Sequence, residues 1–165
     1  MKTTITFSDL LHTGHSCNSI PYGIGLVASN ALKLLGDRFE ARIFKHPHDL
    51  AESMEASPPE IACFSNYIWN SELACEMARR IKEKFPRTVI VFGGPNYPLD
   101  REEQKRFLEA HPYVDFYIFK DGEEAFVELL KALFEYDFDI AKLKTDSPEL
   151  PNCHFMAGKE LVTGG

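Results

Sequence analysis

Two stretches of the sequence decide the fold: Thr88-Val-Ile-Val-Phe-Gly-Gly-Pro95 and Val114-Asp-Phe-Tyr-Ile-Phe-Lys-Asp-Gly-Glu-Glu-Ala-Phe126. Each is a short β-branched or aromatic run that ends in glycine and polar residues and leads into a helical pattern. In a parallel sheet the carboxyl ends of the strands line one edge, and open α/β sheets bind ligands there. Both glycine-bearing turns are therefore expected at one ligand-binding edge, where the Gly93-Gly94 backbone leaves room for a flat group.

The rest of the chain repeats this alternation of strand and helix. Apolar or β-branched runs predict strands at residues 3–8, 39–44, 60–65, 88–92 and 114–119. Amphipathic patterns predict helices at about 22–35, 47–56, 71–85, 101–110 and 123–135. Asn70 or Ser71 is expected to cap the third helix, and Asp100-Arg-Glu-Glu103 is typical of a capping box. The expected fold class is α/β: a flavodoxin- or Rossmann-like, doubly wound parallel sheet of five strands in the order 2-1-3-4-5, within a three-layer α/β/α arrangement.

The sequence after residue 135 breaks this pattern. Residues 136–151 are acidic and contain proline without a sustained period, and Cys153 to Val162 read as a hairpin around Ala157-Gly158. A small hairpin without a partner strand is only marginally stable by itself. We therefore expect a binding domain at residues 1–135, followed by a connector at residues 136–165 whose hairpin leads towards a part that this sequence lacks.

Composition and charge exclude several classes of function. The net charge of −7 and the lack of a basic stripe argue against a nucleic-acid partner. No apolar run approaches the roughly 20 residues that span a bilayer, and the amino terminus reads as a strand rather than a signal peptide. The four cysteines show no metal-ligand spacing. They are expected to be reduced thiols in a cytoplasmic protein, with Cys63 and Cys75 in the core.

One glycine motif points to a nucleotide but stands in the wrong context. Gly23-Ile-Gly-Leu-Val-Ala28 matches the dinucleotide pattern G-x-G-x-x-A. That pattern needs a tight turn directly after the first strand, whereas about a dozen residues intervene here, and Lys45 stands where an acidic residue would bind a ribose hydroxyl. A nucleotide-binding domain therefore ranks third among the functions considered.

Metal and nucleophile signals are weak. None of the six histidines belongs to a recognisable metal-ligand grouping, although His12 and His15 lie in the loop at the expected ligand edge. Ser65 lacks the G-x-S-x-G context of a hydrolase nucleophile, and Cys17 has no basic partner that the sequence identifies.

The predicted edge instead collects small, polar and aromatic residues. Many hydrogen-bonding groups with few charges suit a large, planar, amide-decorated ligand, although ordinary turn residues are polar as well. The residues are Thr13, Gly14, Ser16, Asn18 and Ser19 after the first strand, Ser65, Asn66, Tyr67, Trp69 and Asn70 after the third, Gly93, Gly94, Pro95 and Asn96 after the fourth, and Asp121, Gly122 and Glu123 after the fifth.

Over residues 3 to 135 the chain resembles the B12-binding (cobalamin-binding) domain at the amino end of cobalamin-dependent radical SAM enzymes. The order and spacing of several short motifs carry the resemblance. These are Pro21-Tyr-Gly23, Phe64-Ser65, Ala78-Arg-Arg-Ile-Lys82, Phe85-Pro86, Val91-Phe-Gly-Gly-Pro95, Val114-Asp115, Gly122-Glu-Glu-Ala-Phe126 and Leu129-Leu130.

The resemblance implies that the dimethylbenzimidazole tail of cobalamin inserts between the first and third strands, with the corrin over the edge. Ser65 and the first loop would line the slot, and Gly93 and Gly94 would accept the nucleotide portion. Valine at either glycine is expected to abolish binding in a folded domain. The candidate cofactor-binding residues are His12, Thr13, Gly14, Ser16, Ser65, Asn66, Tyr67, Gly93, Gly94, Pro95, Asn96, Gly122 and Glu123.

The sequence departs from the family pattern at two places. In the motif D-x-H-x-x-G, Asp9 and Gly14 match, but Leu11 holds the histidine position and His12 comes one residue late. We therefore expect base-off cobalamin without a histidine on cobalt, with His12 as the first remaining candidate ligand and His15 as the next. The usual Gly-Glu-Gly-Glu run is replaced by Lys120-Asp-Gly-Glu123.

The domain that carries radical SAM chemistry in such enzymes is not found in this sequence. No C-x-x-x-C-x-x-C spacing occurs, so S-adenosylmethionine and a 4Fe-4S cluster are expected only in an absent C-terminal domain, the implied partner. The chain alone is expected to carry cobalamin for a methyltransferase or related enzyme and to catalyse nothing. The alternative is a cofactor-free, receiver-like interaction domain, but Ser65 and Asn66 close the third strand where a receiver would need a phosphorylatable aspartate.

Overall fold

The structure is a computed structural model that describes residues 2–12 and 20–164. The strands are β1 (Thr3–Ser8), β2 (Phe39–Phe44), β3 (Ile61–Ser65), β4 (Val89–Gly93), β5 (Phe116–Ile118), β6 (Cys153–Ala157) and β7 (Glu160–Thr163). The helices are α1 (Tyr22–Leu35), the 3-10 turn η1 (Gly36–Arg38), α2 (Pro47–Ala56), α3 (Ser71–Lys84), α4 (Arg101–Ala110), α5 (Gly122–Glu135) and α6 (Ile140–Asp146). None of the helices in these ranges is long and apolar enough to cross a membrane.

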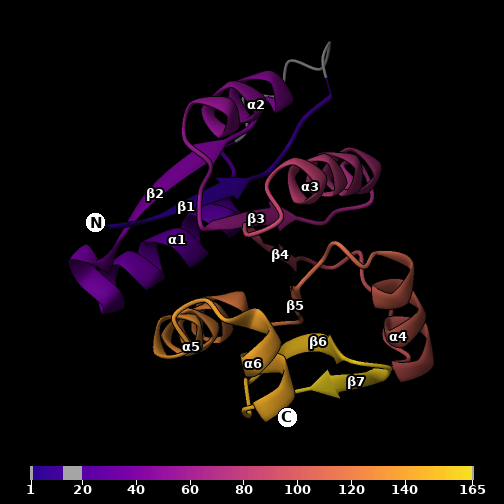
Figure 1. The fold of residues 1–165 in the computed structure, drawn as a ribbon. Helices are drawn as coiled ribbons and strands as arrows, with labels where there is room; N and C mark the ends of the chain where they lie inside the picture. The colour runs from indigo at the N-terminus through magenta and orange to yellow at the C-terminus, as the bar shows by residue number, and fades with distance from the viewer. Residues whose placement is uncertain (1, 13–19, 165) are drawn as a thin grey trace.

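All these strands form one mixed sheet in the order β2-β1-β3-β4-β5-β6-β7 (Figure 1). β1 to β5 are parallel, and β6 and β7 are antiparallel to their neighbours. The prediction of a five-stranded sheet was therefore wrong in its extent, because the C-terminal hairpin extends the sheet. The parallel part carries the α/β crossovers that place helices on both faces.

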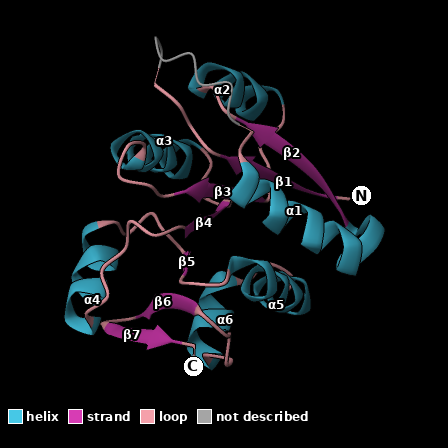
Figure 2. Ribbon diagram, turned by 180° about the vertical axis from the view of Figure 1, so that it is seen from behind, coloured by secondary structure: helices cyan, strands magenta, loops and turns pink. Residues whose placement is uncertain are grey.

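Two buried cores lie on opposite faces of the sheet, so the molecule has three layers (Figure 2). Side chains alternate between the faces along each strand. In β4, Val89 and Val91 join the core beneath α1, α5 and α6, whereas Ile90 and Phe92 join the core beneath α2, α3 and α4. The α1/α5 face is the face on which the candidate site lies.

The hairpin has a partner strand, contrary to the sequence-based expectation. Tyr117 of β5 pairs with His154 of β6, and Phe116 and Phe155 pack edge to face with ring centroids 5.5 Å apart. Cys153 and Phe155 are both fully buried in the α1/α5 core. The hairpin is thereby stabilised by pairing and by burial.

The segment before the hairpin also contains a helix that the sequence did not predict. α6 is short, and Asp139 caps it by accepting a hydrogen bond from the Lys142 amide at 3.0 Å. Its Leu143 is fully buried in the same core as α5. A helix of about two turns is too short to show a clear apolar period, which is why the pattern was missed.

Of the two expected helix N-caps, the structure confirms the one at α4 and contradicts Asn70 as the cap of α3. The Asp100 carboxylate accepts hydrogen bonds from the amides of Glu102 and Glu103, as a capping residue should. Asn70 precedes α3 but makes no capping bond to that helix. Its side-chain oxygen accepts from the Tyr67 amide at 2.8 Å instead, so it closes the turn that follows β3.

Candidate functional site

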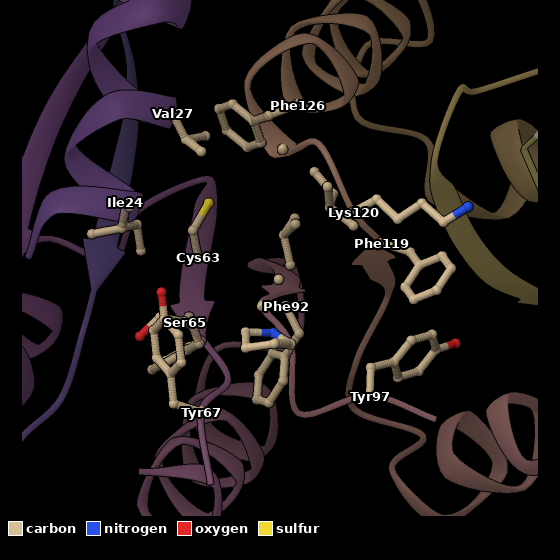
Figure 3. Close-up of a pocket in the computed structure, with 18 of the residues that line it drawn as sticks. Ile24, Val27, Cys63, Ser65, Tyr67, Phe92, Tyr97, Phe119, Lys120 and Phe126 are labelled. Atoms are coloured by element: carbon tan, nitrogen blue, oxygen red, sulfur yellow. The ribbon is translucent and has the colours of Figure 1, made fainter. Parts of the chain in front are cut away.

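A cavity of about 500 Å³ opens at the carboxyl ends of the parallel strands, on the face covered by α1 and α5 (Figure 3). Phe7, Cys63 and Val91 lie in its lining one or two residues below the strand ends, so it reaches roughly 7 Å into the molecule. Phe7 packs against Phe126 of α5, with ring centroids 5.4 Å apart. This volume falls within the range of about 300–1,000 Å³ that is usual for small-molecule sites.

Helix α1 and strand β5 complete the walls with apolar side chains. Ile24 and Val27 of α1 and Phe126 of α5 face the same space in Figure 3, and Ile118 borders it from β5. Sequence reasoning missed these residues, because amphipathic periodicity marks them as ordinary core. Their common feature, an apolar face next to a strand end, does not by itself distinguish a filled core from a cavity.

Gly93 ends β4 and borders the cavity between Ser65 of β3 and Ile118 of β5. A Cβ atom at Gly93 would lie 3.6 Å from the Ile118 carbonyl oxygen and 3.8 Å from the Ile118 Cβ, which are ordinary contacts. The backbone therefore tolerates a side chain here, and that side chain would occupy the α1/α5 face of the strand, where the cavity lies.

At Gly94 the backbone itself requires glycine. Its φ is +128°, and a Cβ atom would lie 2.7 Å from the carbonyl oxygen of Asn66. A side chain here would collide with backbone in a region that L-residues avoid. The expectation that valine at Gly94 leaves the domain folded was therefore wrong, and only Gly93 offers a clean substitution.

Asn66 and Asn96 support the glycine turn and do not line the cavity. Asn66 is fully buried, and its side-chain amide donates to the Asn96 carbonyl at 2.8 Å and to the Tyr117 hydroxyl at 3.1 Å. The Tyr117 hydroxyl in turn donates to the Gly94 carbonyl at 2.9 Å. This buried network fixes the turn that carries Gly94 and Pro95.

A second polar network joins the ends of β1 and β3. The Ser65 hydroxyl donates to the Asp9 carboxylate at 2.6 Å, and the Asn70 amide donates to the same carboxylate at 3.0 Å and to Ser65 at 3.1 Å. Ser65 borders the cavity. In the sequence, Asp9 is recognisable only as the first position of an incomplete motif, whereas Asn70 was predicted both as a helix cap and as one of the polar residues at the edge.

His12 lies on the surface, away from the cavity lining. Its Nε2–H donates to the carbonyl oxygen of Trp69 at 3.1 Å. The Trp69 ring stacks on Tyr67, with centroids 4.6 Å apart and planes 4° apart. Thr13, Gly14 and Ser16, also expected at the site, lie outside the described residues. Within the described part of the chain, no three His, Cys, Asp or Glu residues are grouped to hold a metal ion.

The turn after β5 supplies the remaining expected residues. Gly122 and Glu123 both border the cavity, and a Cβ atom at Gly122 would lie 3.3 Å from a methyl group of Val27. Lys120 also borders it with φ +66°, a conformation that is unfavourable for a residue with a side chain. Figure 3 shows the Lys120 side chain extending away from the cavity, and its Nζ lies 5.3 Å from the centroid of the Phe119 ring.

The interior of the cavity is electrically neutral. Complete burial raises the pKa of the Cys63 thiol far above its ordinary value, so the group stays protonated. Burial, with smaller effects of Arg101 and Lys120, lowers the pKa of the nearby His154 to about 4. No histidine occurs among the described residues that line the cavity, so Cys63 has no adjacent base. These groups suit binding of a flat apolar moiety better than acid–base or nucleophilic catalysis.

Large apolar side chains are exposed around the mouth, in the segments that follow β1, β3 and β4. An exposed apolar group of this size is typical of a surface that another molecule or domain covers. The residues and their exposed fractions are Ile20 at 82%, Tyr22 at 72%, Ile68 at 82%, Trp69 at 59% and Leu99 at 86%.

Solved structures share this fold. The cobalamin-dependent S-adenosylmethionine radical enzyme OxsB with aqua-cobalamin and S-adenosylmethionine bound matches with a TM-score of 0.72 at 15% identity, over 99% of this chain and 22% of that chain. The receiver domain of NtrC4 from Aquifex aeolicus matches with a TM-score of 0.55 at 15% identity, over 82% of this chain and 98% of that one. At such identity both likenesses concern the fold alone.

Sequence comparison is more specific. The cobalamin-dependent radical SAM methyltransferase TokK of Streptomyces tokunonensis is 33% identical over 109 residues, which cover 64% of this chain and 14% of TokK. The 2-(S-pantetheinyl)-carbapenam-3-carboxylate methyltransferase of Streptantibioticus cattleyicolor is 42% identical over 72 residues, which cover 44% of this chain and 10% of that enzyme. The chain thus spans a small part of the length of these relatives. The family model of the B12 binding domain matches residues 31–130 of the 165, and the chain belongs to the B12-binding domain family.

Proposed function

We propose that this chain is the cobalamin-binding domain of a radical SAM methyltransferase or related enzyme. The cavity beside Gly93 carries this proposal, since it lies at the carboxyl edge of the sheet, where α/β folds bind ligands. Family membership and the names of the two methyltransferase relatives support it. When bound, cobalamin supplies a transferable methyl group.

The residues present fit the nucleotide tail of cobalamin. The deep part of the cavity offers few hydrogen-bonding groups, because its lining is apolar. Gly93 ends β4 beside this space, and a Cβ atom at Gly93 would fill part of it. In this proposal the tail lies between α1, α5 and the ends of β3, β4 and β5. Ser65, Gly94, Pro95, Gly122 and Glu123 border the mouth and would hold the ribose and phosphate portion, and Tyr67 would lie beside the corrin.

We further propose that cobalamin binds base-off and without a histidine on cobalt. With the tail in the cavity, its benzimidazole is too far from the corrin to act as a ligand. His12 is the nearest described histidine in sequence to the motif position, and its Nε2 already donates to the Trp69 carbonyl. Leu11, at the motif position itself, carries no nitrogen.

The proposed partner is a radical SAM domain elsewhere in the same enzyme. The sequence contains no C-x-x-x-C-x-x-C spacing, so a 4Fe-4S cluster and S-adenosylmethionine would be held outside this chain. The exposed apolar residues at the mouth support such a covering domain, because they would otherwise face water. A receiver-like function finds less support, since Ser65 and Asn66 end β3 where a phosphorylatable aspartate would be needed.

The test is direct. The full chain is incubated with hydroxocobalamin, desalted, and examined by absorbance spectroscopy. We expect corrin absorbance to remain with the protein, and we expect the spectrum of the base-off form after reduction. Desalted protein without corrin absorbance after incubation at about millimolar cobalamin, the weak limit of ordinary affinity, would contradict the proposal.

A further inference from the structure

The deep part of the cavity offers a bound molecule almost no hydrogen-bonding side chains. Its lining consists of hydrocarbon from α1, α5 and three strands, together with the protonated thiol of Cys63, which is a weak donor. The side chains concerned are Phe7, Ile24, Val27, Val91, Ile118 and Phe126.

The polar side chains of the lining are either engaged elsewhere or placed at the mouth. The Ser65 hydroxyl already donates to Asp9 and accepts from Asn70. The Tyr97 hydroxyl lies 3.4 Å from Nδ1 of His154, on the opposite core of the sheet. Tyr67, Lys120 and Glu123 come after the strand ends, so their polar groups lie at the level of the mouth.

We infer that this cavity selects corrinoids by the polarity of their lower base: it accepts the apolar dimethylbenzimidazole and disfavours a purine. The inference rests on the proposed function and adds a specificity to it. Adenine has nearly the same planar outline but carries an exocyclic amine and further ring nitrogens. Buried among these side chains, those groups would lose their bonds to water without finding replacements, which costs free energy for each group left unpaired.

The experiment compares three corrinoids on the full chain by absorbance titration. They are cobalamin, the cobamide that carries adenine in place of dimethylbenzimidazole, and cobinamide, which has no nucleotide base. We expect cobalamin to bind most tightly and the adenine form to bind at least about tenfold more weakly, the effect of one or more unpaired buried groups. Cobinamide should also bind more weakly than cobalamin, because it leaves the cavity empty.

The outcomes separate this inference from the proposed function. Equal affinity for cobalamin and the adenine form would overturn the selectivity, while leaving cobalamin binding intact. If cobinamide binds as tightly as cobalamin, the tail does not occupy the cavity, and the inferred selectivity is overturned as well. Failure of all three to bind would refute the proposed function itself.

A matched pair of variants tests whether the selectivity for the lower base arises at the cavity wall. Val91→Thr adds a hydroxyl to a residue that lines the cavity, whereas Val89→Thr adds one two residues earlier, on the same face but in the closed core. We expect Val91→Thr to reduce the preference for cobalamin over the adenine form by about threefold or more, and Val89→Thr to leave the ratio unchanged. An unchanged ratio in Val91→Thr would contradict the inference, and the comparison on the unaltered chain decides it even if a variant folds poorly.

Discussion

Gly93 is the residue at which space for the ligand can be tested most cleanly. Gly93→Val should fold, since its Cβ makes only ordinary contacts with Ile118, but its methyl groups would fill the mouth of the cavity. We expect cobalamin affinity to fall by at least about tenfold and the melting temperature to stay within a few degrees of that of the unaltered chain. Titration and thermal unfolding measure the two quantities.

The matched control is Gly25→Val. A Cβ atom at Gly25 meets nothing within 4 Å, and this residue of α1 does not line the cavity. It should bind cobalamin as the unaltered chain does. If Gly93→Val also binds normally, the tail does not lie against the end of β4.

At the residue scale, His12 is also the position at which the expected absence of a histidine ligand on cobalt can be tested. Because its Nε2 donates to Trp69 and its side chain is exposed, we expect the electron paramagnetic resonance spectrum of reduced, bound cob(II)alamin to show no nitrogen splitting from histidine. His12→Ala should give the same spectrum. Nitrogen splitting that is present in the unaltered chain and absent from His12→Ala would make His12 the ligand.

Between elements, Tyr117 links β5 to the turn after β4. Tyr117→Phe removes a buried hydroxyl that donates to the Gly94 carbonyl and accepts from the Asn66 amide, and Asn66 stays fully buried without it. Leaving such groups unpaired costs about 1–3 kcal/mol of the free energy of unfolding. We expect that loss in urea titrations, with weaker cobalamin binding because the turn is no longer fixed.

Tyr97→Phe provides the comparison for this network. Tyr97 stacks on Tyr117, with ring centroids 3.8 Å apart, but its hydroxyl makes only a long contact of 3.4 Å with His154. Its removal should cost clearly less than that of the Tyr117 hydroxyl. Equal losses in the two variants would mean that ring packing, and not the bond to Gly94, holds the turn.

The burial of His154, which pairs with Tyr117 where β6 meets β5, also makes the free energy of unfolding depend on pH. Burial, together with Arg101 and Lys120, lowers the pKa of His154 from 6.5 to about 4, so the folded state favours the neutral ring. Between these two values the unfolded chain binds more protons than the folded one, and stability falls as the pH falls from 6.5 towards 4. We expect His154→Gln to reduce this slope in unfolding titrations. An unaltered slope in His154→Gln would contradict the assignment.

Sequence patterns predicted most of the local elements but missed how the C-terminal hairpin joins the sheet. The Asp100 cap and the apolar runs of β3 and β4 are local signals, and the structure confirms them. The hairpin was also recognised locally, but its pairing with β5 depends on contacts between distant parts of the chain. For the same reason Gly93 and Ser65 were placed at the edge, whereas the cavity walls from α1 and α5 were not, since an apolar helix face reads alike whether it is packed or open.

Across the whole molecule, the carboxyl edge of the sheet and its opposite edge differ in character. The carboxyl edge has the cavity and the exposed Ile20, Ile68 and Leu99. Towards the opposite end, Lys82 pairs with Asp115 at 2.7 Å, and Asp115 also accepts from the Ile90 amide at 2.7 Å. The Lys82–Asp115 ion pair is thus made within the chain, whereas Ile20, Ile68 and Leu99 face solvent, which supports the proposal that another domain covers the carboxyl edge.

The largest-scale prediction concerns the segment after residue 135. A fragment of residues 1–135 should have a lower free energy of unfolding than the full chain and should aggregate more readily, because it exposes β5 as a sheet edge and loses the buried Cys153 and Phe155. Phe155→Ala in the full chain tests the packing alone, with an expected loss of about 3–5 kcal/mol.

Lys159→Ala, at an exposed position in the turn of the same hairpin, should change the free energy of unfolding by no more than about 0.5 kcal/mol. Urea titration monitored by circular dichroism measures all of these variants. Residues 136–165 would prove dispensable for the fold if the fragment matched the full chain in stability. If the fragment is instead unstable, cobalamin binding has to be measured on proteins that keep the hairpin, because Tyr117 of β5 both pairs with His154 of β6 and holds Gly94 at the cavity.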